Sequence, residues 1–137
     1  MKIKGLYLTN ILNLPRNIKI LSMILIDSCL CCLSVWFAFY LRLGNFSTPV
    51  EWMFVPMFIL TIISILVFWL LGVYKDVFRF FDKYNISKLF LAILIYSIFV
   101  LTIITIFSIE HVPRTIGFIQ PILYFLSLYI VRSIFSY

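Results

Sequence analysis

The chain has 137 residues, of which 64% are hydrophobic, 19% aromatic and only 12% charged, whereas a soluble domain typically carries about 25% charged residues. This composition excludes a water-soluble globule, a disordered tail and a disulfide scaffold. The length leaves no room for a nucleotide-binding catalytic domain beside the apolar segments. The net charge is +6, and the charged residues cluster beside apolar runs. This position favours anionic lipid headgroups as the partner of the basic residues and argues against nucleic acid.

Four apolar runs are long enough to span a bilayer, which takes about 20 residues. They cover residues 20–41, 52–71, 89–109 and 115–135. An open sheet in lipid would leave backbone groups unpaired, so we predict that all four runs are helices. The chain is therefore expected to be an all-α polytopic membrane protein, with residues 1–137 forming a single four-helix transmembrane domain.

Asp27 lies inside the first predicted span, where a carboxylate costs about 2.5–3.5 kcal/mol on insertion scales. It is a candidate proton or cation site, or else one half of a structural ion pair. Asp27 is eight residues beyond Lys19, roughly 12 Å along a helix axis, which places it away from the middle of the membrane. This position favours the structural interpretation.

Arg132 is the candidate partner of Asp27. It follows Arg114 by 18 residues, roughly 27 Å along the axis, and so lies near the same membrane surface as Asp27. We predict that Asp27 and Arg132 form a structural ion pair between the first and fourth helices. A lipid phosphate is the alternative partner for Arg132, and a serine, Ser22 or Ser28, is the alternative for Asp27.

The segment between the second and third spans has an amphipathic pattern over residues 73–84. On a helical wheel, its apolar side chains fall within an arc of about 160°, opposite the charged ones. They are Val73, Tyr74, Val77, Phe78, Phe80, Phe81 and Tyr84. An aromatic face opposite a basic face is typical of a helix that lies in the membrane interface. We therefore predict an interfacial helix over residues 73–84.

Lys and Arg residues are unevenly divided between the two sides of the predicted helices. The N-terminal segment, residues 72–88 and the C-terminal end carry nine of the eleven, and the other two are Arg42 and Arg114. Cytoplasmic segments of membrane proteins are enriched in Lys and Arg. Both termini and the loop 72–88 are therefore predicted to be cytoplasmic.

The sequence contains no motif that predicts a catalytic, cofactor-binding or metal-binding residue. Its four glycines are far apart, whereas a dinucleotide site needs closely spaced glycines. The chain has one histidine, His111, and no convincing Ser-His-Asp triad can be assembled around it. The cysteines Cys29, Cys31 and Cys32 all lie within the first span, where they are expected to be small packing residues.

Several short motifs nevertheless occur in a defined order. Leu14-Pro-Arg16 precedes the first span, Asp27 lies within it, and Trp36-Phe-Ala-Phe-Tyr-Leu-Arg-Leu-Gly44 closes it. Further along are Gly72-Val-Tyr-Lys-Asp-Val-Phe-Arg79 and Val112-Pro-Arg-Thr115, with Arg132 at the end of the fourth span. In this order the chain resembles the N-terminal membrane region of the bacterial CapD-type polysaccharide biosynthesis proteins, the membrane-bound nucleoside-diphosphate-sugar 4,6-dehydratase/epimerase family. Thr115 departs from the Ser expected there, which is a conservative change.

The resemblance implies a multi-pass protein of the bacterial inner membrane, with a cytoplasmic Rossmann-type domain after the fourth helix. In that family the Rossmann-type domain binds NAD(P) and dehydrates a UDP-N-acetylhexosamine on the way to surface glycans. No residue here corresponds to its motifs. The chain is therefore expected to be a fragment, the non-catalytic anchor of an NAD(P)-dependent lyase, with no cofactor of its own.

Two other interpretations stay open. The membrane region of a polyprenyl-phosphate sugar-1-phosphate transferase has a similar four-helix start, although the Leu-Arg-Leu-Gly and Val-Pro-Arg-Thr motifs favour the dehydratase. A small four-helix proton-coupled exchanger would use Asp27, but its loops would be shorter than the basic loop 72–88. Association of the chain with further copies of itself also stays open.

Overall fold

The computed structural model describes residues 15–44, 50–76, 83–108 and 112–136. Every element in these ranges is a helix: α2 (Arg16–Leu43), α3 (Val50–Leu70), α4 (Val73–Asp76), α5 (Lys83–Phe107) and α6 (Ile116–Ser136). All but α4 are long and apolar enough to cross a membrane. The predicted all-α fold with four spanning helices is confirmed, and the chain is a multi-pass membrane protein.

Local sequence explains both ends of α2. Pro15 precedes its first residue, a place where the missing proline N–H costs no helical hydrogen bond. Gly44 ends the helix in the left-handed conformation, with φ 67°, and its N–H donates to the Tyr40 carbonyl at 2.9 Å. Glycine is favoured there because it has no Cβ to clash. The helix has 28 residues, about 42 Å in length, so it exceeds a hydrocarbon core of about 30 Å.

The buried face of α2 is more polar than its outer face. It repeats every three or four residues and consists of Asp27, Cys31, Ser34, Val35, Ala38 and Phe39. Leucines such as Leu21, Leu25 and Leu33 lie on the outside and are more than half exposed. Lipid solvates leucine as well as a protein core does, but it offers no partner to a polar group. The polar side chains of α2 therefore turn inward.

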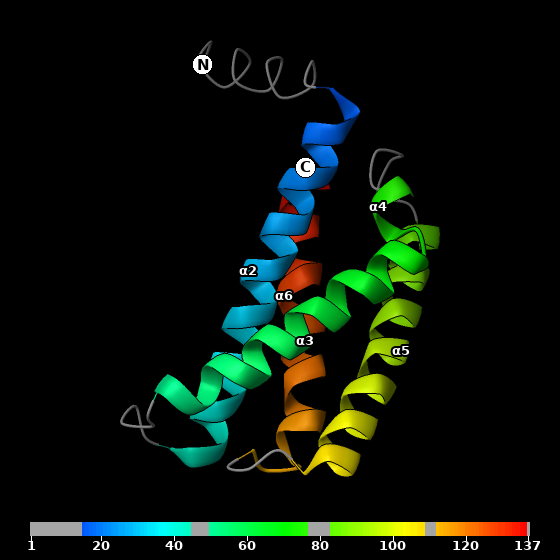
Figure 1. Cartoon of the computed structure of the whole chain (residues 1–137). Coiled ribbons are helices and arrows are strands. Elements are labelled where there is room, and N and C mark those ends of the chain that lie inside the picture. Colours follow the sequence, from blue (N-terminus) through cyan, green and yellow to red (C-terminus); the bar gives the residue numbers. More distant parts are fainter. Residues whose placement is uncertain (1–14, 45–49, 77–82, 109–111, 137) are drawn as a thin grey trace.

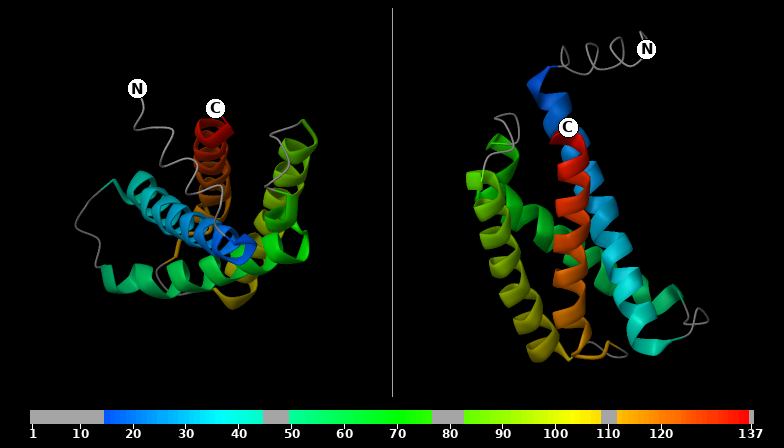
Figure 2. Two further views of the ribbon diagram at one scale, coloured as in Figure 1. Left: turned by 90° about the horizontal axis from the view of Figure 1, so that it is seen from above. Right: turned by 180° about the vertical axis from the view of Figure 1, so that it is seen from behind.

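The four long helices form a ring (Figures 1 and 2). Helix α2 packs against α3 and α6, and α5 packs against the same two helices from the opposite side. Within the described ranges, the diagonal pairs α2/α5 and α3/α6 have no close backbone approach. Helix α3 runs obliquely across the bundle, while α2 and α6 run side by side (Figure 1). The centre of the ring has to be filled by long side chains.

Helices α5 and α6 approach each other closely at one end and diverge toward the other (Figures 1 and 2). Gly117 lies at the close end, where an added Cβ would come within 2.9 Å of Leu101 Cδ2. At the other end, the rings of Phe90 and Phe125 lie between the helices, with centroids 5.7 Å apart. The absence of a side chain at Gly117 allows the close approach, and the aromatic rings occupy the wider end.

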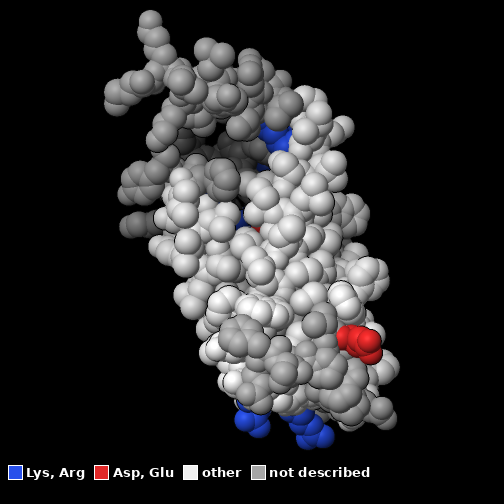
Figure 3. Space-filling view, turned by 90° about the vertical axis from the view of Figure 1, so that its left-hand side faces the viewer, with Lys and Arg blue, Asp and Glu red and all other residues white. Residues whose placement is uncertain are grey.

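Charged residues gather at the two ends of the bundle. The start of α2, the end of α6 and helix α4 lie together at one end (Figure 1). This end includes Arg16, Lys19 and Lys75. Arg42 ends α2 and Arg114 precedes α6, at the opposite end. On the face shown in Figure 3, Lys and Arg lie mainly near the two ends, an acidic patch lies toward the lower end, and most of the surface between the ends is uncharged.

The segment 73–84 differs from its predicted arrangement. Helix α4 covers only Val73–Asp76, and Tyr84 is the second residue of α5. Val73 and Tyr74 are 4% and 3% exposed, and the Tyr74 ring lies 6.2 Å from that of Phe68. The side chains of both residues therefore face protein, whereas the prediction had them face the membrane interface.

The physical reason is that a helical wheel finds an apolar face but not what covers it. Here α2, α3 and α5 cover α4. The other residues of the predicted interfacial helix lie outside the described residues: Val77, Phe78, Phe80 and Phe81.

Candidate functional site

The structure brings together the two residues that were predicted to form an ion pair. Arg132 Nη2, near the end of α6, donates to Asp27 Oδ2 of α2 at 3.2 Å. The side chains are 12% and 5% exposed, respectively. Helices α2 and α6 pack along each other in opposite directions, so the second half of α6 lies beside the first half of α2. The alternative partners Ser22 and Ser28 instead donate to backbone carbonyls of α2, those of Lys19 and Ile24.

Tyr74 of α4 belongs to the same cluster. Burial, and secondarily the negative charge of Asp27, raises the pKa of the Tyr74 hydroxyl far above its ordinary value, so the phenol stays neutral. Among the described residues, the Tyr74 hydroxyl and Arg132 Nε are buried atoms without a hydrogen-bond partner of normal geometry. Helix α4 thus places an uncharged polar group close to the ion pair.

Tyr124 of α6 bridges one diagonal of the ring. Its hydroxyl and that of Ser64 on α3 are 2.6 Å apart, and it also approaches the backbone carbonyl of Asp27 at 3.4 Å. The Tyr124 ring stacks on Phe68 of α3 with a centroid distance of 5.8 Å. A tyrosine suits this place because its ring fills the centre while its hydroxyl reaches a partner on the far helix.

Gln120 and Tyr96 bridge the other diagonal. The Tyr96 hydroxyl on α5 donates to Gln120 Oε1 at 3.0 Å, and Gln120 Nε2 donates to Ser34 Oγ on α2 at 3.0 Å. Cys31 Sγ lies 3.8 Å from both the Tyr96 hydroxyl and Gln120 Nε2. Gln120 and Tyr96 are 0% exposed. These contacts connect α2, α5 and α6 through a single amide.

Sequence reasoning missed Gln120, Tyr96 and Tyr124. A signal was present, because polar side chains inside spanning segments normally face the bundle interior and pair with one another. Asp27 was considered because it is charged, whereas the neutral polar residues were not. These contacts form two hydrogen-bonded groups, which meet where the Tyr96 and Tyr124 rings pack in a T shape at a centroid distance of 5.6 Å. Together the two groups extend across all four long helices, and we call them the polar network: Asp27, Arg132, Tyr124, Ser64, Gln120, Tyr96, Ser34 and Cys31.

The side chains of the polar network bond mainly to one another, across helices. No cluster of three or more His, Cys, Asp or Glu side chains that could hold a metal occurs within the described ranges. Cys31 is buried in the network, Cys32 Sγ lies 3.5 Å from Thr61 Oγ1, and Cys29 faces outward. The carboxylate and the amide already have protein partners, which leaves little polar capacity for a substrate.

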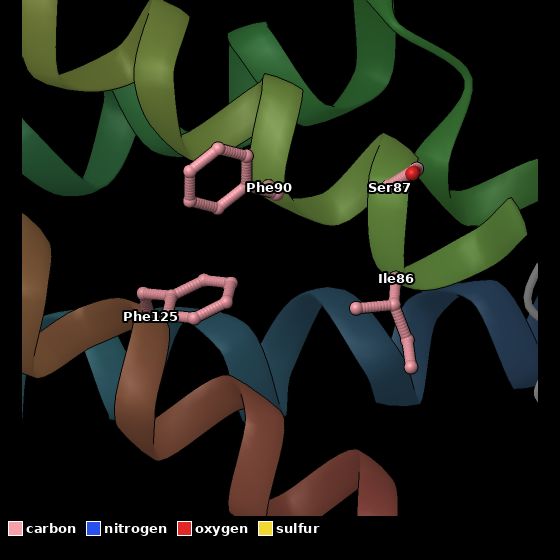
Figure 4. A pocket seen from close by; sticks show the side chains of 4 residues that line it. All are labelled: Ile86, Ser87, Phe90 and Phe125. Atoms are coloured by element: carbon pink, nitrogen blue, oxygen red, sulfur yellow. The ribbon is translucent and has the colours of Figure 1, made fainter. Parts of the chain in front are cut away.

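A second feature is an open groove between α5 and α6, at the end where the two helices diverge. It is lined by Ile86, Ser87 and Phe90 of α5 and by Phe125 of α6 (Figure 4). Its volume is about 320 Å³. Ser87 supplies the one polar side chain in this lining, so the groove is suited to an apolar ligand.

The fold and the polar network together define a class, a multi-pass helical membrane protein whose helices are joined by buried polar contacts. Comparisons of the chain with models of protein families, with curated proteins and with solved structures find no match.

Proposed function

We propose that this chain is the membrane-anchoring domain of a CapD-type nucleoside-diphosphate-sugar 4,6-dehydratase that acts in bacterial surface polysaccharide biosynthesis, and that it is itself non-catalytic. The observation that carries this proposal is the internal pairing of the polar network, which leaves the bundle a structural role. The ordered motifs support the same assignment. Leu14-Pro-Arg16 leads into α2, Leu-Arg-Leu-Gly44 ends it, and Val112-Pro-Arg-Thr115 leads into α6.

A proton-coupled exchanger is less well supported by these contacts. Its coupling carboxylate has to bind and release an ion from each side of the membrane in turn. The Asp27 side chain is 5% exposed and is paired with Arg132. A guanidinium that stays in place competes with any incoming cation, so the geometry favours a structural carboxylate.

NAD(P) does not fit the residues of this chain. Dinucleotide sites need closely spaced glycines at a strand-to-helix turn, so that the backbone can approach the pyrophosphate. Gly5, Gly44, Gly72 and Gly117 are far apart in the sequence, and no strand occurs in the described ranges. The cofactor and the dehydration step are therefore assigned to a cytoplasmic Rossmann-type domain joined after α6.

The anchoring function is tested with a chimera. Joining this chain to the catalytic domain of a CapD-type dehydratase should direct that domain to the membrane and restore surface polysaccharide in a bacterium that lacks its own enzyme. The isolated 137-residue chain should bind no NAD in calorimetry. Saturable NAD binding by the chain alone, or an inactive chimera that is folded and inserted in the membrane, would contradict the proposal.

We place the protein in the bacterial inner membrane with both termini in the cytoplasm. The basic residues at the end formed by the start of α2, the end of α6 and α4 support this orientation, because Lys and Arg concentrate on the cytoplasmic side. Arg42 and Arg114 at the other end leave a much smaller positive charge there. The cytoplasmic end would then face the anionic lipids of the inner leaflet and the Rossmann-type domain.

Reporter fusions test this orientation. A phosphatase joined after Asn45 should be active, because that enzyme needs the periplasm, and one joined after Asp82 should be inactive. A fluorescent protein that folds only in the cytoplasm should give the reverse result at the same two positions. The same compartment at both positions would rule out the proposed topology.

A further inference from the structure

The groove between α5 and α6 opens outward, onto the surface that faces lipid in a membrane. Phe90 is 52% exposed and meets Phe125 edge to face, with 77° between the ring planes. Phe125 also stacks on Tyr129, one turn further along α6, at a centroid distance of 6.3 Å. The Phe90 and Phe125 side chains face each other from α5 and α6, and both line this open groove (Figure 4).

The groove runs from the membrane surface toward the middle of the bilayer. Ile86 is three residues from the start of α5 at Lys83, roughly 4.5 Å along the axis, which is near the headgroups. Phe125 is nine residues from the start of α6 at Ile116, roughly 13.5 Å along the axis, which is near the middle of a hydrocarbon core about 30 Å thick. A lipid chain lies in this same direction in a bilayer.

The size of the groove and the charge near it indicate which kind of molecule it can hold. A helix from a second chain has a diameter of about 10–12 Å with its side chains and would not enter a groove of about 320 Å³. The outer end of the groove lies at the basic end of the bundle. Lys88 follows Ser87 in the sequence, and Arg16, Lys19 and Lys75 lie at the same end. Such charge attracts anionic headgroups, at about 1 kcal/mol per Lys or Arg near the surface.

We propose that this groove binds one acyl chain of an anionic phospholipid. The acyl chain lies along the Phe90 and Phe125 rings, and the phosphate lies at the level of Ser87 and Lys88. The Ser87 hydroxyl supplies a hydrogen bond to the phosphate oxygens. This lipid site does not depend on the proposed anchoring function, because it rests on the membrane-spanning bundle alone.

Native mass spectrometry of the delipidated protein tests the site. Dioleoylphosphatidylglycerol should be retained at least about threefold more than dioleoylphosphatidylcholine, a typical size for one polar contact in a membrane. Ser87→Trp fills the groove with an indole and should lower retention of the anionic lipid by a similar factor. Thr105→Trp is the matched control, because Thr105 lies on the same face of α5 five turns away. It should leave retention unchanged.

Two further measurements keep the outcome decisive. Lys88→Gln should remove the preference for the anionic lipid without abolishing phosphatidylcholine binding. A photoactivatable phosphatidylglycerol with a diazirine in its acyl chain should label Phe90 and Phe125 in the wild-type protein. Equal retention of the anionic lipid in Ser87→Trp and Thr105→Trp would overturn the proposal, as would labelling spread evenly around the bundle. Loss of dimers in Ser87→Trp with unchanged lipid retention would assign the groove to a second copy instead.

Discussion

Asp27→Asn and Arg132→Gln should each destabilise the bundle by about 3 kcal/mol, because each change leaves the other residue of a buried ion pair without its partner. The double variant should lose at least about 1 kcal/mol less than the sum of the single losses. Desolvation of the two groups offsets much of their attraction. The pair is therefore expected to matter more for locking α2 to α6 than for the net stability of the protein.

The measurement is a double-mutant cycle on the free energy of unfolding in mixed detergent micelles. Ser28→Ala is a suitable control, since the Ser28 hydroxyl donates within its own helix to the Ile24 carbonyl at 2.7 Å and its loss should cost well below 1 kcal/mol. Strictly additive losses for Asp27 and Arg132 would mean that the two residues do not interact. Asp27 would then become a candidate for ion coupling again.

Gln120→Ala should be about as damaging, with a loss of roughly 3 kcal/mol. The change empties part of the bundle centre and removes the amide partner of the Tyr96 and Ser34 hydroxyls, which stay buried without that hydrogen bond. Gln120→Leu keeps most of the side-chain volume and should lose about 1–2 kcal/mol, the part that depends on hydrogen bonds. Comparing the two variants separates cavity formation from lost polar pairing.

The control for Gln120 is Ile122→Ala on the same helix. Ile122 is 62% exposed on the outer surface of the bundle, where lipid replaces the lost contacts, so the expected loss is below about 1 kcal/mol. All three variants are compared by unfolding in the same detergent mixture. Equal losses for Gln120→Ala and Ile122→Ala would show that the centre of the ring is not held by the Gln120 contacts.

Much of the fold follows from the sequence because a bilayer restricts the choices. A spanning segment has to be helical, and its length has to match the hydrocarbon thickness. The four apolar runs therefore predict the four long helices, and Pro15 and Gly44 explain the bounds of α2. The Asp27–Arg132 pair could also be predicted, since residue counts from the membrane surface give the depth of each residue.

Depth alone does not show which residues face each other across the bundle. Gln120, Tyr96 and Tyr124 became part of one polar network only through the rotation of α5 and α6 about their axes. Val73 and Tyr74 illustrate the same limit, because their apolar face is covered by protein rather than by the membrane interface.

The sequence by itself determined the membrane class, the helices and the depth of the buried charges, whereas the tertiary structure decided the polar network and the groove. The physical reason is that lipid, and not water, surrounds the helices. In water, a hydrophobic stripe marks the inner face of a helix. In lipid, the core and the surroundings are equally apolar, so close packing and polar pairing between helices decide which face turns inward.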